Sequence, residues 1–222
     1  MSFLQLKNIF RYKKNRLHYR QDFLLNLALL EAGLDPNNFD IKTDHVNGYN
    51  YVNGLKLEVV YPKYFFNLCE KLDWHSKSID YYFNGYDEKD GGRRELLRKF
   101  EDTKSIIEFS SFGRDASNKG AFNKSYFEGM ASARFALCPH QLNWPHLHSR
   151  MWTYRFIEAC MTFAIPIVFS QTKLSDSFVH GIAHFTDTEI GNHKYSYEDA
   201  MRNYRVAFDR HTLSIDCIDR LR

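Results

Sequence analysis

The chain has 222 residues, of which 44% are hydrophobic and 16% aromatic, and it carries 30 Lys and Arg against 27 Asp and Glu. This composition excludes an intrinsically disordered chain, and the length allows one large domain or one full domain with a partial one. The formal net charge of +3 is too small to indicate a nucleic-acid-binding protein by itself.

Positive charge is concentrated in residues 11–20, which contain five Lys or Arg and no acidic residue. Such a cluster can bind phosphate, nucleic acid or an anionic membrane surface, but it also fits a solvated helix face or an N-terminal arm. Elsewhere basic and acidic residues are interleaved, and no zinc or helix-turn-helix pattern is visible. We therefore expect no nucleic-acid partner.

The cysteines and the apolar segments indicate the cellular compartment in which the protein is expected. The four cysteines are scattered without C-x-x-C spacing, which predicts reduced thiols. The N-terminal sequence lacks the pattern of a signal peptide, and no apolar stretch approaches the roughly 18 residues that span a bilayer. These features predict a cytoplasmic protein without a transmembrane segment.

The first part of the chain has an irregular pattern. Helical spacing of leucines predicts a helix over 21–32, which ends at Gly33. Residues 35–38 and 47–54 are rich in Asn, Asp, Gly and Pro and are interpreted as turns. A strand is predicted over 55–61, ending at Pro62, and a helix over 64–72.

From residue 78 the pattern becomes regular. Strands are predicted over 79–83, 105–109, 135–138, 165–169 and 181–185, and helices over 93–101, 124–133, 150–164 and 196–209, with a turn at Asn84-Gly85. Such alternation is typical of βαβ units, so we expect an α/β fold: a Rossmann-like parallel sheet with helices on both faces over 78–222, preceded by a short α+β region over 1–77. Ligands of such sheets bind beyond the carboxyl ends of the strands, which here places a site near Gly85, Pro139, His140 and the start of helix 150–164.

Two charged residues of the predicted helix 150–164 are candidates for that site. Arg155 and Glu158 are three residues apart and share one helix face. As an exposed ion pair they would contribute roughly a few tenths of a kcal/mol. Alternatively, the Glu158 carboxylate accepts both hydroxyls of a ribose and the Arg155 guanidinium binds a diphosphate, helped by backbone donors at the helix N-terminus, near Ser149 to Thr153.

The second half of the chain resembles the exostosin-like glycosyltransferases over roughly residues 79–190. That family shows S-K-F-C-L-x-P, a loop, S-P-R-x-x-E-A and G-x-I-P-V. The matching positions are Ser132, Phe135, Leu137, Pro139, Arg155, Glu158, Ala159, Ile165, Pro166 and Val168. Upstream, Tyr82-Phe-Asn-Gly85 and Arg94-Glu-Leu-Leu97 resemble the F-x-G and R-x-x-L segments of the family. Thr153-Tyr154 replaces Ser-Pro, Ala164 replaces the usual Gly, and His140-Gln141 replaces the residues after the proline.

The resemblance implies a GT-B-like glycosyltransferase that needs no cofactor or metal and moves a sugar from a nucleotide-diphospho-sugar, of UDP or GDP type, to a glycan hydroxyl with inversion. The donor-binding residues would be Gly85, Arg94, Pro139, His140, Thr153, Arg155 and Glu158. Arg94 and Arg155 would stabilise the departing diphosphate, and residues 1–77 would form a trimmed acceptor-side domain. Asp44 is the first choice for the general base, with Glu70, Asp73 and His75 as rivals, although Asp44 fits a turn residue equally well.

Several alternatives stay open at this point. A related pattern occurs in fucosyltransferases of the same architecture, so the donor sugar is not fixed. His146-x-His148 has the spacing of metal ligands, but no third ligand is placed by the pattern and no D-x-D motif is present, so no metal is predicted. The main rival to an enzyme is a non-catalytic nucleotide- or sugar-binding module of the same fold.

Overall fold

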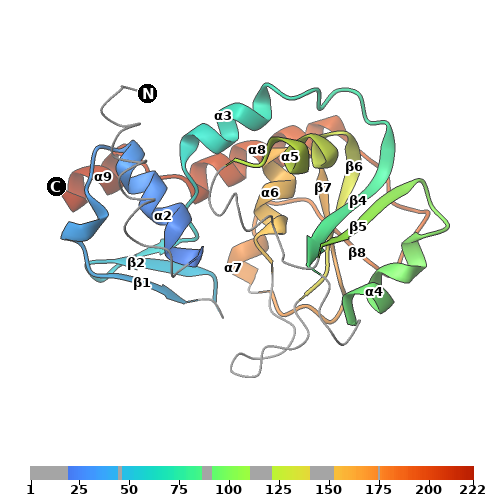
Figure 1. Ribbon diagram of the computed structural model, residues 1–222, viewed down its shortest axis with the longest axis horizontal. Coiled ribbons are helices and arrows are strands. Elements are labelled where there is room, and N and C mark those ends of the chain that lie inside the picture. Colours follow the sequence, from blue (N-terminus) through green and yellow to red (C-terminus); the bar gives the residue numbers. More distant parts are fainter. Residues whose placement is uncertain (1–19, 45–46, 87–91, 111–121, 141–152, 175) are drawn as a thin grey trace. The chain divides into compact units, whose positions relative to one another are not determined.

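The computed structural model describes residues 20–44, 47–86, 92–110, 122–140, 153–174 and 176–222 (Figure 1). It divides into two compact units, of which one is Asn67–Ala207 and the other joins the described residues of Met1–Phe66 to Phe208–Arg222. The sequence-based division at residue 77 had grouped residues 208–222 with the second domain. Residues 11–19 of the basic cluster and the pair His146 and His148 lie outside the described residues.

The first unit contains a three-stranded antiparallel sheet of order β1-β2-β3. Its elements are α2 (Arg20–Glu31), η1 (Pro36–Asn38), β1 (Ile41–Asp44), β2 (Tyr49–Val52), β3 (Leu55–Glu58), the start of α3 (Lys63–Glu70), the end of α8 (Tyr197–His211) and α9 (Ile215–Leu221). The sequence did not predict β1 and β2, because four-residue strands among Asn and Gly carry too little apolar alternation. Asn53 and Gly54 have φ of 49° and 80°, as in the two-residue turn that joins antiparallel strands.

The C-terminal segment belongs to this unit because polar contacts bind it to the end of β3. The Arg210 guanidinium donates to both carboxylate oxygens of Glu58, at 3.0 and 2.6 Å. The backbone N–H of Tyr61 donates to the His211 carbonyl at 2.7 Å. These contacts join residues that are about 150 positions apart, which no local sequence pattern reveals.

The second unit is built on a five-stranded parallel sheet of order β5-β4-β6-β7-β8. Its elements are β4 (Ile79–Tyr86), α4 (Gly92–Leu97), η2 (Arg98–Phe100), β5 (Ser105–Ser110), α5 (Lys124–Ala131), β6 (Ala133–Cys138), α6 (Arg155–Met161), β7 (Ile165–Val168), α7 (Asp176–Val179) and β8 (Phe185–Thr186). The predicted parallel sheet flanked by helices is confirmed. Among the described residues, no helix is long and apolar enough to cross a membrane.

Helices cover both faces of this sheet (Figure 1). On one face, Phe83 and Leu137 pack in a single apolar cluster with Leu97 of α4 and Phe100 of η2. Side chains alternate along a strand, so Tyr82 points to the other face, where a Cβ on Gly129 of α5 would lie 2.6 Å from its ring. Helix α6 lies beside α5 and contacts β6 and β7. This arrangement is consistent with the predicted Rossmann-like sheet.

The strand order reverses between β4 and β6. The chain runs from β4 outward to β5, then crosses back over β4 to β6 and continues to β7 and β8. Pairing of β4 with β6 ends at Tyr82 and Ala136, after which the described part of β4 pairs with β5 and the rest of β6 pairs with β7. The two strands therefore part toward their carboxyl ends, and such a switch point is where parallel α/β sheets bind ligands.

Helix α6 is shorter than the predicted helix 150–164, and its C-terminal end has an unusual backbone. Phe163 has a φ of 56°, a conformation that favours Gly. The motif comparison had placed Ala164 at the position of the family's Gly. In the structure the residue with a positive φ is Phe163. Its ring is stacked between Trp74 and Tyr204, with centroids 3.9 and 4.5 Å away, and this burial offsets the backbone strain.

Lys77 connects the C-terminal ends of two helices. Its Nζ donates to the carbonyl of Ala131, the last residue of α5, at 2.8 Å, and to that of Thr162, directly after α6, at 3.4 Å. Carbonyls at helix C-termini lack intrahelical partners, so this amine satisfies groups that would otherwise be left unbonded. Lys77 thus helps to fix α5 and α6 beside each other.

The backbone of Phe163 yields a test of stability. Phe163→Ala should lower the free energy of unfolding by about 3–5 kcal/mol, because it removes a buried ring. Phe163→Gly should be more stable than Phe163→Ala by roughly 1 kcal/mol, because Gly adopts a positive φ without strain. Ala164→Gly is the control and should be destabilising. Chemical denaturation measures all three, and a lower stability of Phe163→Gly than of Phe163→Ala would contradict the assigned backbone.

Lys77 yields a test of pH dependence. Burial lowers its pKa from 10.5 to about 7, against the opposing effect of Asp73. Between these values the unfolded chain holds a proton that the folded chain has released, so the free energy of unfolding should rise with pH across this window. Wild type should therefore gain stability relative to Lys77→Met as the pH increases from about 7 to 10 in urea titrations. A constant difference between the two proteins would disprove a neutral amine in the folded state.

Candidate functional site

Three consecutive residues of β4 hold the guanidinium of Arg155. The Arg155 Nη2 donates to the Asn84 carbonyl at 2.7 Å. Its Cζ lies 4.4 Å from the centroid of the Phe83 ring, within the range of a cation–π contact. A Cβ on Gly85 would lie 2.5 Å from Nη2, so any larger residue would have to displace the guanidinium. Asn84-Gly85 was predicted to be a turn, but both residues lie inside β4.

The guanidinium occupies the place where β4 and β6 part. The Asn84 carbonyl lies beyond the last β4–β6 pair, at Tyr82 and Ala136, and accepts its hydrogen bond from Arg155 instead. Arg155 is only 7% exposed. Its Nε and the Thr153 Oγ1 are buried without a hydrogen-bond partner among the described residues. An unsatisfied buried donor costs about 1–3 kcal/mol, so an acceptor from a ligand would be bound favourably here.

A second buried arginine lies at the same end of the sheet. Arg93 of α4 is 5% exposed, and its Nη1 donates to the Tyr86 carbonyl at 3.1 Å. Its Nε donates to the His140 carbonyl at 3.4 Å. His140 is fully buried, and its Nδ1 lies 3.2 Å from the Thr172 Oγ1. Arg93 therefore links the end of β4 to the residues after β6, which include the buried Pro139.

Glu158 follows Arg155 by three residues in α6 and is buried. It has no exposed surface, and its Oε2 accepts a hydrogen bond from the Tyr126 hydroxyl of α5 at 2.8 Å. Burial of Arg155 and Glu158 rules out the exposed ion pair that was the first interpretation of this motif. The ribose contact stays a prediction, and a ribose would reach this carboxylate only if the residues covering it moved.

Cys138 stands at the carboxyl end of β6. Burial raises the pKa of its thiol to about 12; Arg155 lowers that pKa and Glu158 raises it. The thiol therefore stays protonated at neutral pH, and because thiolates are the nucleophilic form, Cys138 is not suited to covalent catalysis. The two buried arginines of this site are instead suited to binding an anion.

The structure brings most of the predicted donor-binding residues together, and one of them is exposed. Gly85, Pro139, His140, Thr153, Arg155 and Glu158 lie on the elements that meet at the carboxyl ends of β4 and β6. Arg94 is exposed, and its Cζ lies 4.3 Å from the centroid of the Phe109 ring. Its neighbour Arg93 points inward instead. Helical spacing could have indicated this, because Arg93 stands four residues before Leu97, which packs on the sheet.

The predicted general bases have other contacts. Asp44 lies in the first unit, where its carboxylate accepts hydrogen bonds from the backbone and the side chain of Asn47, at 3.0 and 2.8 Å. Asp73 accepts from the Ser76 N–H at 3.3 Å, and the His75 ring is stacked on Trp74. Glu70 ends α3. The contacts of Asp44 are those of a turn residue, the alternative that the sequence had left open.

Two further features bear on ligand binding. No group of three or more His, Cys, Asp or Glu that could hold a metal ion occurs among the described residues.

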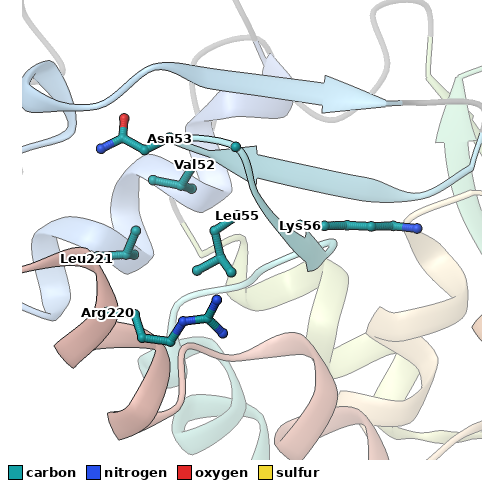
Figure 2. A pocket seen from close by; sticks show the side chains of 7 residues that line it. Val52, Asn53, Leu55, Lys56, Arg220 and Leu221 are labelled. Atoms are coloured by element: carbon teal, nitrogen blue, oxygen red, sulfur yellow. The ribbon is translucent and has the colours of Figure 1, made fainter.

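The first unit has an open hollow of 350 Å³ at the hairpin of β2 and β3, lined by residues 52–56 with Arg220 and Leu221 (Figure 2). Figure 2 shows Lys56 extending away from Arg220, so the two charges do not converge on one ligand.

Comparison with known proteins gives no relative from which a function could be assigned. The chain was compared with protein-family models, with curated proteins and with solved structures. No match was found. The resemblance to exostosin-like enzymes therefore rests on the motifs quoted above, and the candidate site rests on the switch point and its two buried arginines.

The contact between Gly85 and Arg155 can be tested by a double-mutant cycle. Gly85→Ala should displace the guanidinium from the Asn84 carbonyl and lower the free energy of unfolding by about 1–3 kcal/mol. In an Arg155→Met background the same change should cost much less, because the clashing group is gone. Thermal and chemical unfolding of the four proteins gives the coupling energy. Additive effects would show that Gly85 is required for another reason.

Proposed function

We propose that the second unit binds the diphosphate of a nucleotide-sugar donor between the carboxyl ends of β4 and β6. The observation that carries this proposal is the buried Arg155 guanidinium at the switch point, whose Nε lacks an acceptor among the described residues. Guanidinium groups bind phosphate oxygens through paired N–H donors, and parallel sheets bind ligands at switch points. The motif resemblance adds the nucleotide sugar, of UDP or GDP type, as the expected ligand.

On this proposal the chain is a glycosyltransferase that delivers the sugar to a glycan hydroxyl. Negative charge grows on the diphosphate as its bond to the sugar breaks, so a fixed cation beside it stabilises the transition state more than the bound donor. Packing on Phe83 and the bond to Asn84 hold Arg155 in place before the reaction begins. The mechanism also needs a general base on the acceptor side to activate the glycan hydroxyl, and Asp44 was the first choice for it.

One observation favours the alternative of a non-catalytic nucleotide-binding module. Both carboxylate oxygens of Asp44 accept hydrogen bonds from Asn47, which leaves the role of base without a clear candidate. A module of this kind would keep the Arg155 site and bind the nucleotide without turnover. Release of nucleoside diphosphate from a nucleotide sugar, measured with and without acceptor glycans, separates the enzyme from the module.

Nucleotide binding itself is tested by thermal unfolding. UDP or GDP should raise the melting temperature, by an amount that corresponds to about 2.7 kcal/mol at one hundred times the dissociation constant. The shift should persist in EDTA and disappear in Arg155→Met, while the hairpin-turn variant Asn53→Gly, in the first unit, keeps it. A shift that EDTA removes would show that the site needs a metal ion, and its persistence in Arg155→Met would place the nucleotide elsewhere.

Turnover tests the mechanistic role of Arg155. Arg155→Ala should reduce kcat by about 10²–10³-fold, more than it weakens donor binding, because the interaction strengthens in the transition state. Arg155→Lys should recover part of the loss, since a point charge replaces a paired donor. Steady-state kinetics with a cognate donor gives both quantities. A variant that loses only affinity would make Arg155 a binding residue without a role in the chemical step.

A further inference from the structure

The parallel sheet of the second unit ends at β5, and no strand among the described residues pairs with its outer edge. A strand at the edge of a sheet presents backbone N–H and carbonyl groups that can pair with a strand of another chain. Along this segment Lys104, Ile106 and Glu108 are exposed, whereas the residues between them are partly buried. Ile106 is 38% exposed although it lies within a strand. The edge of β5 is therefore a candidate for an interface.

Backbone hydrogen bonds show which groups point outward from this edge. The N–H of Asp80 in β4 donates to the Lys104 carbonyl at 2.8 Å, so the backbone of Lys104 faces β4. Backbone groups of successive residues point to opposite edges of a strand, so those of Ser105 and Ile107 face outward. The Ser105 N–H donates to the Thr103 carbonyl at 2.7 Å. The outer edge thus offers the Ile107 N–H and the carbonyls of Ser105 and Ile107.

Two opposite charges flank the exposed Ile106 at equal spacing. Lys104 stands two residues before it and Glu108 two residues after it, so the three side chains share one face. The Nδ2 of Asn84 donates to the Glu108 Oε2 at 2.6 Å, which orients the carboxylate, and Lys104 has no ion pair among the described residues. A twofold rotation about Ile106 exchanges the positive and the negative position, so this edge is complementary to itself.

We infer that β5 pairs with β5 of a second copy of this chain, antiparallel and centred on Ile106. Each Lys104 then lies opposite Glu108 of the other copy, and the two Ile106 side chains lie opposite each other. The Ile107 N–H of each copy donates to the Ser105 carbonyl of the other. The two sheets become continuous across the twofold axis. This inference is independent of the proposed function, because it uses none of the residues proposed to bind the donor.

The distribution of charge selects this register over the alternatives. Centring the pair on Lys104 or on Glu108 would place two like charges directly opposite each other, which is destabilising. Centring it on Ile107 would place Ile106 opposite Glu108 and leave Lys104 without a partner charge. Only the register centred on Ile106 pairs both charges and the apolar side chains while its outward backbone groups form hydrogen bonds.

Charge reversal tests the pairing by sedimentation velocity over a range of protein concentrations. Wild type should form a dimer. Lys104→Glu and Glu108→Lys should each weaken the dimer by about 10-fold or more, because two attractive pairs become two repulsive pairs. The double variant Lys104→Glu with Glu108→Lys should recover the dimer, since the charges are exchanged. Lys71→Glu makes the same change at another exposed lysine of this unit and should match wild type.

A disulfide tests the register itself. Facing residues of an antiparallel pair without mutual hydrogen bonds have Cα atoms about 4.5 Å apart, within the range of roughly 4.4–6.8 Å that a disulfide spans. Ile106→Cys should therefore give a covalent dimer under mild oxidation, detected by non-reducing electrophoresis. Wild type, in which Cys69, Cys138 and Cys160 are buried, and Lys71→Cys should stay uncrosslinked.

Several outcomes would overturn this inference. Wild type that stays monomeric at the highest concentration measured would exclude the dimer. A dimer that both single charge reversals leave intact, or a double variant as weak as the single ones, would place the interface elsewhere. Failure of Ile106→Cys to crosslink in a dimeric protein would exclude the register. Binding of UDP to the charge-reversed variants should equal that of wild type, so loss of the dimer and failure of the proposed function are measured separately.

Discussion

The contact between the Arg155 guanidinium and the end of β4 is the constraint on which the candidate site depends. Strands β4 and β6 part after Tyr82 and Ala136, so the Asn84 carbonyl lies beyond the last pair of these two strands. A guanidinium supplies the missing donor and adds a full positive charge at the same point. The same guanidinium thus satisfies a backbone carbonyl and is a group that binds phosphate well.

Neighbouring elements are arranged to keep this contact in place. Phe83 lies against the guanidinium, and Gly85 lacks the side chain that would displace it. Behind Arg155, the buried carboxylate of Glu158 accepts from Tyr126, so α6 is tied to α5, and the amine of Lys77 joins the ends of the same two helices. An arginine fixed from several sides needs little reorganisation when a ligand arrives, which is the condition for strong electrostatic stabilisation.

The sequence predicted the parallel sheet because apolar segments typical of strands alternate with segments that have the spacing of helices. Prediction from the sequence failed for features that depend on contacts between residues far apart in the chain. Asn84-Gly85 has the composition of a turn, yet both residues lie in β4, and Gly85 faces the guanidinium of an arginine 70 positions away. The motif also does not say which of two adjacent arginines points inward, and in the structure the buried one is Arg93. Strands β1 and β2 were too short and polar to detect, and the contacts of the C-terminal segment with β3 leave no local trace.

Arginine side-chain NMR tests the central claim most directly, because it observes the donor that lacks a partner among the described residues. The Nε–H resonance of Arg155 can be assigned by its absence from Arg155→Lys and followed while UDP is added. Binding at the switch point predicts a shift of this resonance that saturates with the dissociation constant measured by calorimetry. A resonance that stays unchanged while UDP saturates the protein would contradict the account.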